Sequence, residues 1–368
     1  MNVLKNNVRC LAGIFAGLLM FSGCKVKMSS EERVGQSEID AMNDSQITFV
    51  NADHTEYPSV TVEYQDYDLN FLAETLWGLT PEIIENNKQD NIIMLPTGKE
   101  QDTYQIPQLA VYDGNSGLNF WRYSDMDCYR VVFDIAYENS DLPFQPSVLA
   151  KTFQLDGDSA VREQAQETVS AVLEQIGFIS NSVDVFYFDK DSLNQLQKVD
   201  TLLPPGYERD ENGNPVYKSE PWETEDEAFG FLVKPQYQNI PIESFYGEAM
   251  LTMVYQIGKQ EIVYAKTSMP VLTDHVVSEK TNEIISGKDA ALYASELLSE
   301  LSGEKNQEIS RAELLYAFST TNKDVINHTV TLDPCWKVSY HTDQDDTVEQ
   351  FILINAVTGE MLSNQTGL

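Results

Sequence analysis

One cysteine, Cys24, stands directly after a signal-like segment, where its thiol could be covalently modified in an exported protein. It follows a basic start, with Lys5 and Arg9, and a short apolar run over residues 11–20. This order is typical of a secretory signal peptide. The apolar run falls well short of the roughly 20 residues that a helix needs to span a bilayer. We therefore interpret the segment as a signal and not as a transmembrane helix.

The run Phe21-Ser22-Gly23-Cys24 resembles the end of a bacterial lipoprotein signal. The resemblance implies that residues 1–23 are removed and that the Cys24 sulfur carries a diacylglyceryl group. An ordinary secreted protein and an uncleaved anchor are the alternatives. Two acyl chains suffice for stable attachment. The predicted location is the extracytoplasmic face of a Gram-positive cell membrane, with the lipid on Cys24 as the link to the membrane.

The rest of the chain lacks the residue spacings of common catalytic and metal sites. It contains no G-x-S-x-G, H-E-x-x-H, P-loop or G-x-G-x-x-G run. Four histidines are present, and none has metal-ligand spacing: His54, His275, His328 and His341. The run from Asp210 begins like an EF-hand loop, but Pro215 stands where glycine is required. We predict no catalytic residue, no metal and no cofactor, and the balance is against an enzyme.

The charge of the chain excludes one class of partner. The formal net charge is −34, with 58 acidic residues against 24 lysines and arginines. Affinity for nucleic acid depends on cations that neutralise phosphates. We therefore predict no nucleic-acid partner. So acidic a surface would attract cations, and a solvated face without a specific partner is the simpler explanation.

Two further cysteines, Cys128 and Cys335, remain in the mature chain. An even pair in an exported protein permits a disulfide. Both lie in strand-like runs, where buried free cysteines are also common. The sequence leaves the two alternatives open.

A long polar segment, Leu203–Glu227, is the candidate recognition loop. It is rich in turn residues and carries Tyr207, Tyr217 and Trp222 among charges. Loops of this length are usually functional or disordered, and exposed Tyr and Trp are frequent recognition residues. A loop whose aromatic side chains pack onto the body is the alternative.

Composition and periodicity divide the whole chain into five segments. They are a signal (1–23), a flexible acidic tether (24–56), an N-terminal mixed domain (57–150) and two helix-plus-sheet modules (151–274 and 275–368). Amphipathic spacing predicts helices over 69–78, 81–87, 159–176 and 288–301, with Asp158 as an N-cap. Alternation predicts strands after each of the last two helices, and also over 128–137.

The two modules correspond loosely in the order of their strands. The expected fold class is therefore α+β, with tandem modules of one helix on an antiparallel sheet. In the second module, the Trp336 strand and the run Asn355-Ala356 to Thr358-Gly359-Glu360 resemble the closing hairpin of PepSY-type domains. The first module's run Phe229–Ile242 is similar to the YycH/YycI-type regulatory proteins.

The whole chain also looks like lipoproteins common in clostridia and other Firmicutes. These resemblances imply a non-catalytic extracytoplasmic protein, and PepSY-type domains are associated with inhibiting a peptidase or regulating a membrane-bound partner. The leading hypothesis is a lipid-anchored protein that binds or regulates an envelope protein partner. The alternative is a ligand-binding lipoprotein for peptide, glycan or cation.

Overall fold

A computed structural model describes the chain in separate stretches. They are residues 47–51, 55–95, 108–111, 118–122, 129, 132–133, 146–179, 181–196, 221–244, 250–267, 270–302, 308–318, 328–342 and 345–364. All belong to one compact unit, Gln46–Leu368. Cys24 and the predicted tether up to residue 46 lie outside the described residues.

Strands dominate this unit. In chain order they are β1 Thr48–Val50, β2 Glu56–Gln65, β3 Lys88–Gln89, β4 Ile92–Met94, β5 Gln108–Val111, β6 Leu118–Trp121, β7 Asn181–Phe188, β8 Ala228–Tyr237, β9 Ile240–Ser244, β10 Leu251–Gln256, β11 Glu261–Thr267, β12 Val271–Glu283, β13 Glu308–Phe318, β14 Thr329–Thr342, β15 Asp345–Asn355 and β16 Met361–Asn364. The helices are α3 Leu69–Trp77, α4 Pro81–Asn87, α6 Pro146–Thr152, α7 Ser159–Gln175, α8 Lys190–Leu196, a 3-10 turn Thr224–Asp226 and α9 Gly287–Ser302.

The predicted helices form where caps and amphipathic spacing coincide. Asp158 begins α7, its carboxylate accepting hydrogen bonds from the Ala160 and Val161 amides at 2.9 and 3.3 Å. Gly78 ends α3 with φ of 65°, a conformation that glycine adopts without strain.

The expected fold class is wrong. In the described part of the chain, sixteen strands join in one mixed sheet, whose main path is β12-β2-β14-β13-β9-β8-β10-β11-β6-β5-β4-β3. Strand β13 pairs in parallel with both β1 and β9. The segments expected to form separate modules are thus hydrogen-bonded to each other and to strands of the expected N-terminal domain. The domain boundaries themselves stay a prediction.

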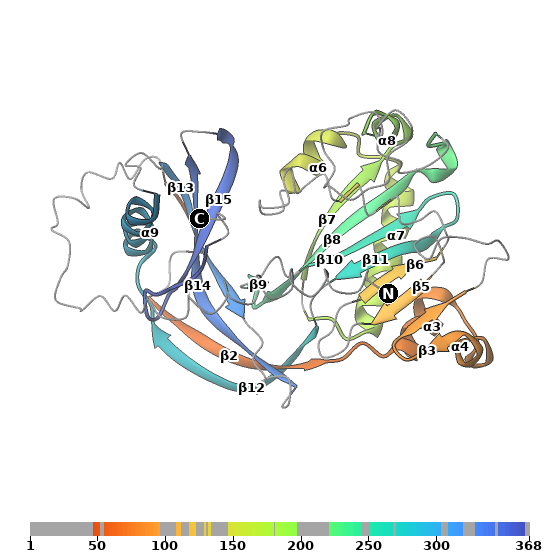
Figure 1. The fold of residues 1–368 in the computed structure, drawn as a ribbon, viewed down its shortest axis with the longest axis horizontal. Helices are drawn as coiled ribbons and strands as arrows, with labels where there is room; N and C mark the ends of the chain where they lie inside the picture. The colour runs from red at the N-terminus through yellow and green to blue at the C-terminus, as the bar shows by residue number, and fades with distance from the viewer. Residues whose placement is uncertain are drawn as a thin grey trace, which may run out of the picture. The chain divides into compact units, whose positions relative to one another are not determined.

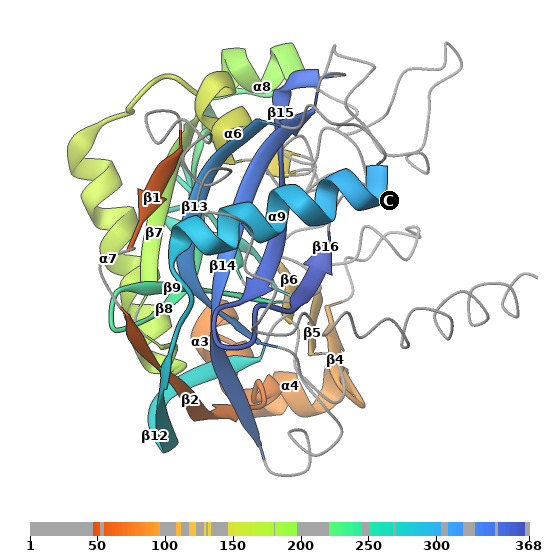
Figure 2. The ribbon, with the colours of Figure 1, turned by 90° about the vertical axis from the view of Figure 1, so that its left-hand side faces the viewer.

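The sheet around β8 also carries more than one helix. Helices α6 and α8 contribute Leu149 and Leu193 to the apolar core on one face, while α7 contacts β10 and β11 from the other (Figure 1). At the other end of the path, α9 lies across β13, β14 and β15 (Figure 2). The expected arrangement, with one helix on each of two separate sheets, is therefore not the one observed: a single sheet carries several helices.

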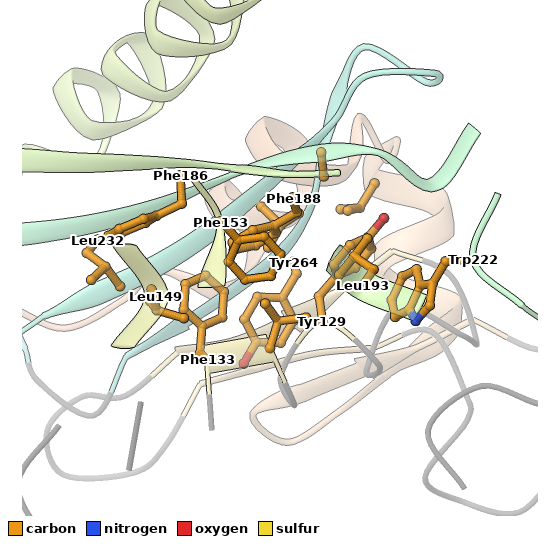
Figure 3. Packing of buried hydrophobic residues seen from close by; sticks show 14 of the residues in the cluster. Tyr129, Phe133, Leu149, Phe153, Phe186, Phe188, Leu193, Trp222, Leu232 and Tyr264 are labelled. Atoms are coloured by element: carbon orange, nitrogen blue, oxygen red, sulfur yellow. The ribbon is translucent and has the colours of Figure 1, made fainter. Parts of the chain in front are cut away.

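The core beneath α6 is largely aromatic. Phe153 and Phe188 rings lie 4.6 Å apart between centroids, and Tyr129 lies 5.2 Å from Trp222 (Figure 3). Tyr129, Val132 and Phe133 are helical in the structure, so the strand predicted over 128–137 is wrong at these positions. All three are buried, and their i, i+3, i+4 spacing is that of one helical face.

Candidate functional site

A pocket opens beside β7, where the chain crosses from α6 to α7. Its volume is about 290 Å³. The apolar lining comes from Ala150, Phe153, Leu155, Val185, Phe186, Tyr187 and Phe229, and the polar lining from Gln154, Asp156 and Arg162. Phe153 and Phe186 also belong to the core of Figure 3, so the pocket is set into the edge of that core.

Gly157 allows the crossing segment to lie close to the aromatic rings. It has φ of 68°, and a Cβ there would come within 3.0 Å of both Phe229 Cζ and Tyr187 Cγ. The Tyr187 and Phe229 rings lie 5.5 Å apart at 40°. A side chain at position 157 would therefore push the segment away from the rings and change the pocket wall.

Arg162 provides the positive charge of the pocket. Its Nη1 lies 3.9 Å from Asp156 Oδ1, and the Asp156 side chain is 97% exposed. Such an exposed pair contributes little to stability. Arg162 lies near the start of α7, where the helix dipole already favours negative charge. The Asp158 carboxylate already caps this helix end and Asp156 lies beside the guanidinium, so Arg162 is the one cation of a rim that also carries two carboxylates.

Tyr187 contributes its ring and not an acid or a base. Burial raises the pKa of Tyr187, and a hydrogen bond to the Glu227 carboxylate and that group's charge raise it further. The Lys190 amide donates to the same carboxylate at 3.3 Å. The Tyr187 hydroxyl thus stays protonated at neutral pH, where a general base would need a pKa near the working pH.

The outer edge of β12 is the second candidate site. Within the described residues, β12 pairs with β2 alone and stands at the end of the sheet path. Every residue from 274 to 281 is exposed, including Val276 at 36% and Val277 at 51%. Register shifts interrupt its first half, and the pairing is regular from Ser278 to Glu283. From Ser278 to Glu283 the edge therefore offers a regularly paired strand whose residues are largely exposed.

The surroundings of this edge are acidic. Glu279 and Glu283 lie on one face of the strand and Lys280 lies on the other. Glu283 is paired with Glu56 of β2. Burial raises the pKa of Tyr237, and the nearby charges of Glu279 and Asp274 raise it further. The charges of Glu279 and Asp274 thus act on Tyr237 at the end of β8.

The described histidines do not gather into a group that could bind a metal. His275 Nδ1 lies 3.1 Å from Glu63 Oε2, and His328 Nδ1 lies 3.8 Å from Asp66 Oδ2, each as a separate pair. His54 lies outside the described residues. Among the described residues, no three or more His, Cys, Asp or Glu side chains form a group that could hold a metal ion.

Of the three predicted recognition residues, the structure describes Trp222, which lies in the core. Trp222 is 4% exposed, and its amide donates to Asn194 Oδ1 at 3.0 Å. It packs in the core of Figure 3, so it is not displayed for recognition. Tyr207 and Tyr217 lie outside the described residues, and their role stays a prediction. The adjoining acids make local contacts, since Asp226 Oδ2 accepts from the Glu223 amide at 2.9 Å.

Cys335 is a free, buried thiol. Burial raises its pKa, and the charge of Asp333 raises it further. Nucleophilic cysteines need a lowered pKa and access to solvent. Cys335 has neither, and Cys128 lies outside the described residues.

Neither candidate site was found from the sequence. The signal for the pocket was present in Asp156-Gly157-Asp158, a turn that leads into a helix whose first turns carry Arg162. The signal for the edge was the run 278–283, which is polar on both faces of a strand.

Comparison with known proteins does not assign a family. No protein-family model matches the chain, and no curated protein matches it. Among solved structures, an uncharacterized protein from Eubacterium rectale is similar, with a TM-score of 0.49 and 15% identity, over 86% of this chain and 89% of that one. Over the part of the chain that the structure describes, no helix has the length and apolar character to cross a membrane.

Proposed function

We propose that this protein is a lipid-anchored extracytoplasmic protein, without catalytic activity, that binds or regulates an envelope protein partner. The exposed outer edge of β12 carries this proposal. An extended segment can add to such an edge through main-chain hydrogen bonds, and its side chains then give specificity. Natural proteins usually protect long edges, because these promote association with other strands.

The charge along β12 indicates the chemistry of the partner. A strand added beside Ser278–Glu283 would place its side chains next to Glu279 and Glu283. Opposite charges on neighbouring strands stabilise pairing by about 0.2–1 kcal/mol per pair. The partner segment is therefore extended and basic, with apolar residues that contact Val276 and Val277.

The resemblance of Phe229–Ile242 and of the Trp336 hairpin to regulatory domains points in the same direction. Domains of that kind are associated with regulation of a peptidase or of a membrane-bound partner. The lipid on Cys24 would hold the protein beside partners in the same envelope.

Photo-crosslinking in living cells tests this proposal. A benzophenone amino acid replaces Val277, and a matched control replaces Val357, which is 36% exposed in the turn after β15. We expect one defined envelope protein to crosslink at position 277 and not at 357, and the crosslink to disappear when Glu279→Lys and Glu283→Lys are added. Equal crosslinking at both positions, or none at 277 in membrane-attached protein, would refute docking at β12.

A ligand-binding lipoprotein for peptide, glycan or cation is the second candidate. The pocket of about 290 Å³ between the crossing segment and β7 favours it. Ligand pockets are typically concave and apolar, with a few polar groups that fix orientation.

A further inference from the structure

We propose that the pocket beside β7 binds an apolar residue through its carboxylate, with the carboxylate on Arg162 and the side chain between the aromatic rings. This inference develops the second candidate function and does not depend on docking at β12. The ligand is a free apolar amino acid or the C-terminal residue of a peptide, because both carry this group beside an apolar side chain.

The shape and lining of the pocket set the apolar part of the ligand. A volume of about 290 Å³ is at the lower limit of the range for small-molecule sites, so it suits one side chain and the atoms next to it. Phe153, Tyr187 and Phe229 provide rings, and Val185 provides an aliphatic wall. An aromatic or branched side chain would bury apolar surface against all of them.

Arg162 determines the charged group of the ligand. A guanidinium has five N–H donors in a planar fork that fits a carboxylate through two hydrogen bonds. Asp156 Oδ1, at 3.9 Å, is beyond normal hydrogen-bond distance from Nη1. A ligand carboxylate can therefore take the fork while Asp156 turns into the solvent that already surrounds it.

The position of Arg162 also departs from a local rule. Cations near the start of a helix are unfavourable because the N-terminal end of the dipole is positive. Here Asp156 and the capping residue Asp158 lie close by and offset this cost. An anion at the rim would meet the Arg162 guanidinium directly, in competition with the carboxylates of Asp156 and Asp158, while the net charge of −34 repels anions at long range. At physiological salt that repulsion is screened beyond about 8 Å, so the local contact decides binding.

Asp156 distinguishes the two sources of the ligand. A free amino acid carries an ammonium group that can pair with Asp156, whereas a peptide C-terminus carries an amide there. The three probes are L-phenylalanine, N-acetyl-L-phenylalanine and L-phenylalaninamide. Binding of the acetylated probe identifies a peptide C-terminus, and binding of phenylalanine alone identifies a free amino acid.

Calorimetric titration of the mature full chain at about 0.15 M salt tests the proposal. Charge-assisted hydrogen bonds contribute about 1.5–3 kcal/mol, so phenylalaninamide should bind about 10–100-fold more weakly than the better carboxylate probe. Arg162→Gln should weaken carboxylate binding by a similar factor and leave phenylalaninamide unchanged. Arg311→Gln, on β13 beside Glu313, is the matched control and should change neither.

A second variant keeps the test independent of Arg162. Ala150 is exposed and lines the pocket, so Ala150→Trp fills the cavity without disturbing the core and should abolish binding of all three probes. Absence of binding to wild type at about 10 mM probe, or binding that survives both Arg162→Gln and Ala150→Trp, would overturn the proposal. Docking at β12 is unaffected by either variant, so the two proposals fail separately.

Discussion

Replacement of Trp336 by alanine should strongly destabilise the sheet that carries α9. Trp336 is 0% exposed and lies in the middle of β14, opposite Leu314 of β13 and Ile354 of β15. Truncation of a buried tryptophan costs about 3–5 kcal/mol. Its Nε1 also donates to the Ile285 carbonyl at 3.0 Å, and loss of that bond adds about 1 kcal/mol.

Urea denaturation followed by far-ultraviolet circular dichroism measures the effect. Trp336→Ala should lower the free energy of unfolding by about 4–6 kcal/mol, a large part of the 5–15 kcal/mol that is typical of native proteins. Trp336→Phe keeps most of the apolar contact and loses the hydrogen bond, so it should cost about 1–3 kcal/mol. Met361→Ala, at a side chain 40% exposed on β16, is the control and should change stability by about 0.5 kcal/mol or less.

The coupling between Trp336 and Gly287 gives a further check of the same packing. A Cβ on Gly287 would lie 3.1 Å from Trp336 Cη2 and 2.9 Å from Phe49 Cδ1. Gly287→Ala should therefore cost less when Trp336 is already alanine, since one of the two overlaps is gone. Wild-type stability in Trp336→Ala, or strictly additive costs in the double variant, would show that the ring does not cover the start of α9.

Three other outcomes are expected. Gly359→Ala should cost about 1 kcal/mol in the same denaturation, because position 359 has φ of 72°. Burial raises the pKa of Tyr316, so the unfolded chain loses the hydroxyl proton at a lower pH than the folded chain, and stability falls as pH rises above about 10. Tyr316→Phe should flatten this fall by up to about 1.4 kcal/mol per pH unit. An unchanged slope would contradict the prediction. Cys24→Ala should move the protein out of the detergent phase on partitioning, and unchanged partitioning would refute lipid attachment.

Local structure could be predicted from the sequence where caps and spacing agree. The α7 helix has the predicted N-cap Asp158 at its start, and the turn after β15 has Gly359, a residue that favours turns, at positive φ. Both depend on residues within a few positions of each other.

The pairing of distant strands could not be predicted in this way. Strand β2 inserts between β12 and β14, so that Val62 faces both Val276 and Val330 across more than 200 residues. Period-two alternation fixes which residues share a face and not which strand lies beside them. The tandem-module expectation failed for this reason.

The position of the pocket could not be predicted, because its wall forms where the segment between α6 and α7 passes from one face of the sheet to the other. Gly157 places the segment after α6 on the rings of Tyr187 and Phe229, which lie 30 and 72 positions further along the chain. The burial of Trp222 agrees with the alternative interpretation of its loop, in which aromatic side chains pack onto the body of the protein. Its indole packs with Tyr129, whose hydroxyl donates to the Asp226 carbonyl beside the same turn.

Amide hydrogen exchange along β12 tests the central claim most directly. The measurement compares the mature protein alone with the same protein bound to the partner that crosslinking at position 277 identifies. Because an added strand would hydrogen-bond the outward amides, exchange over Ser278–Glu283 should slow in the complex. Unchanged exchange there, with slowing instead along another strand such as β7, would contradict partner docking at the β12 edge.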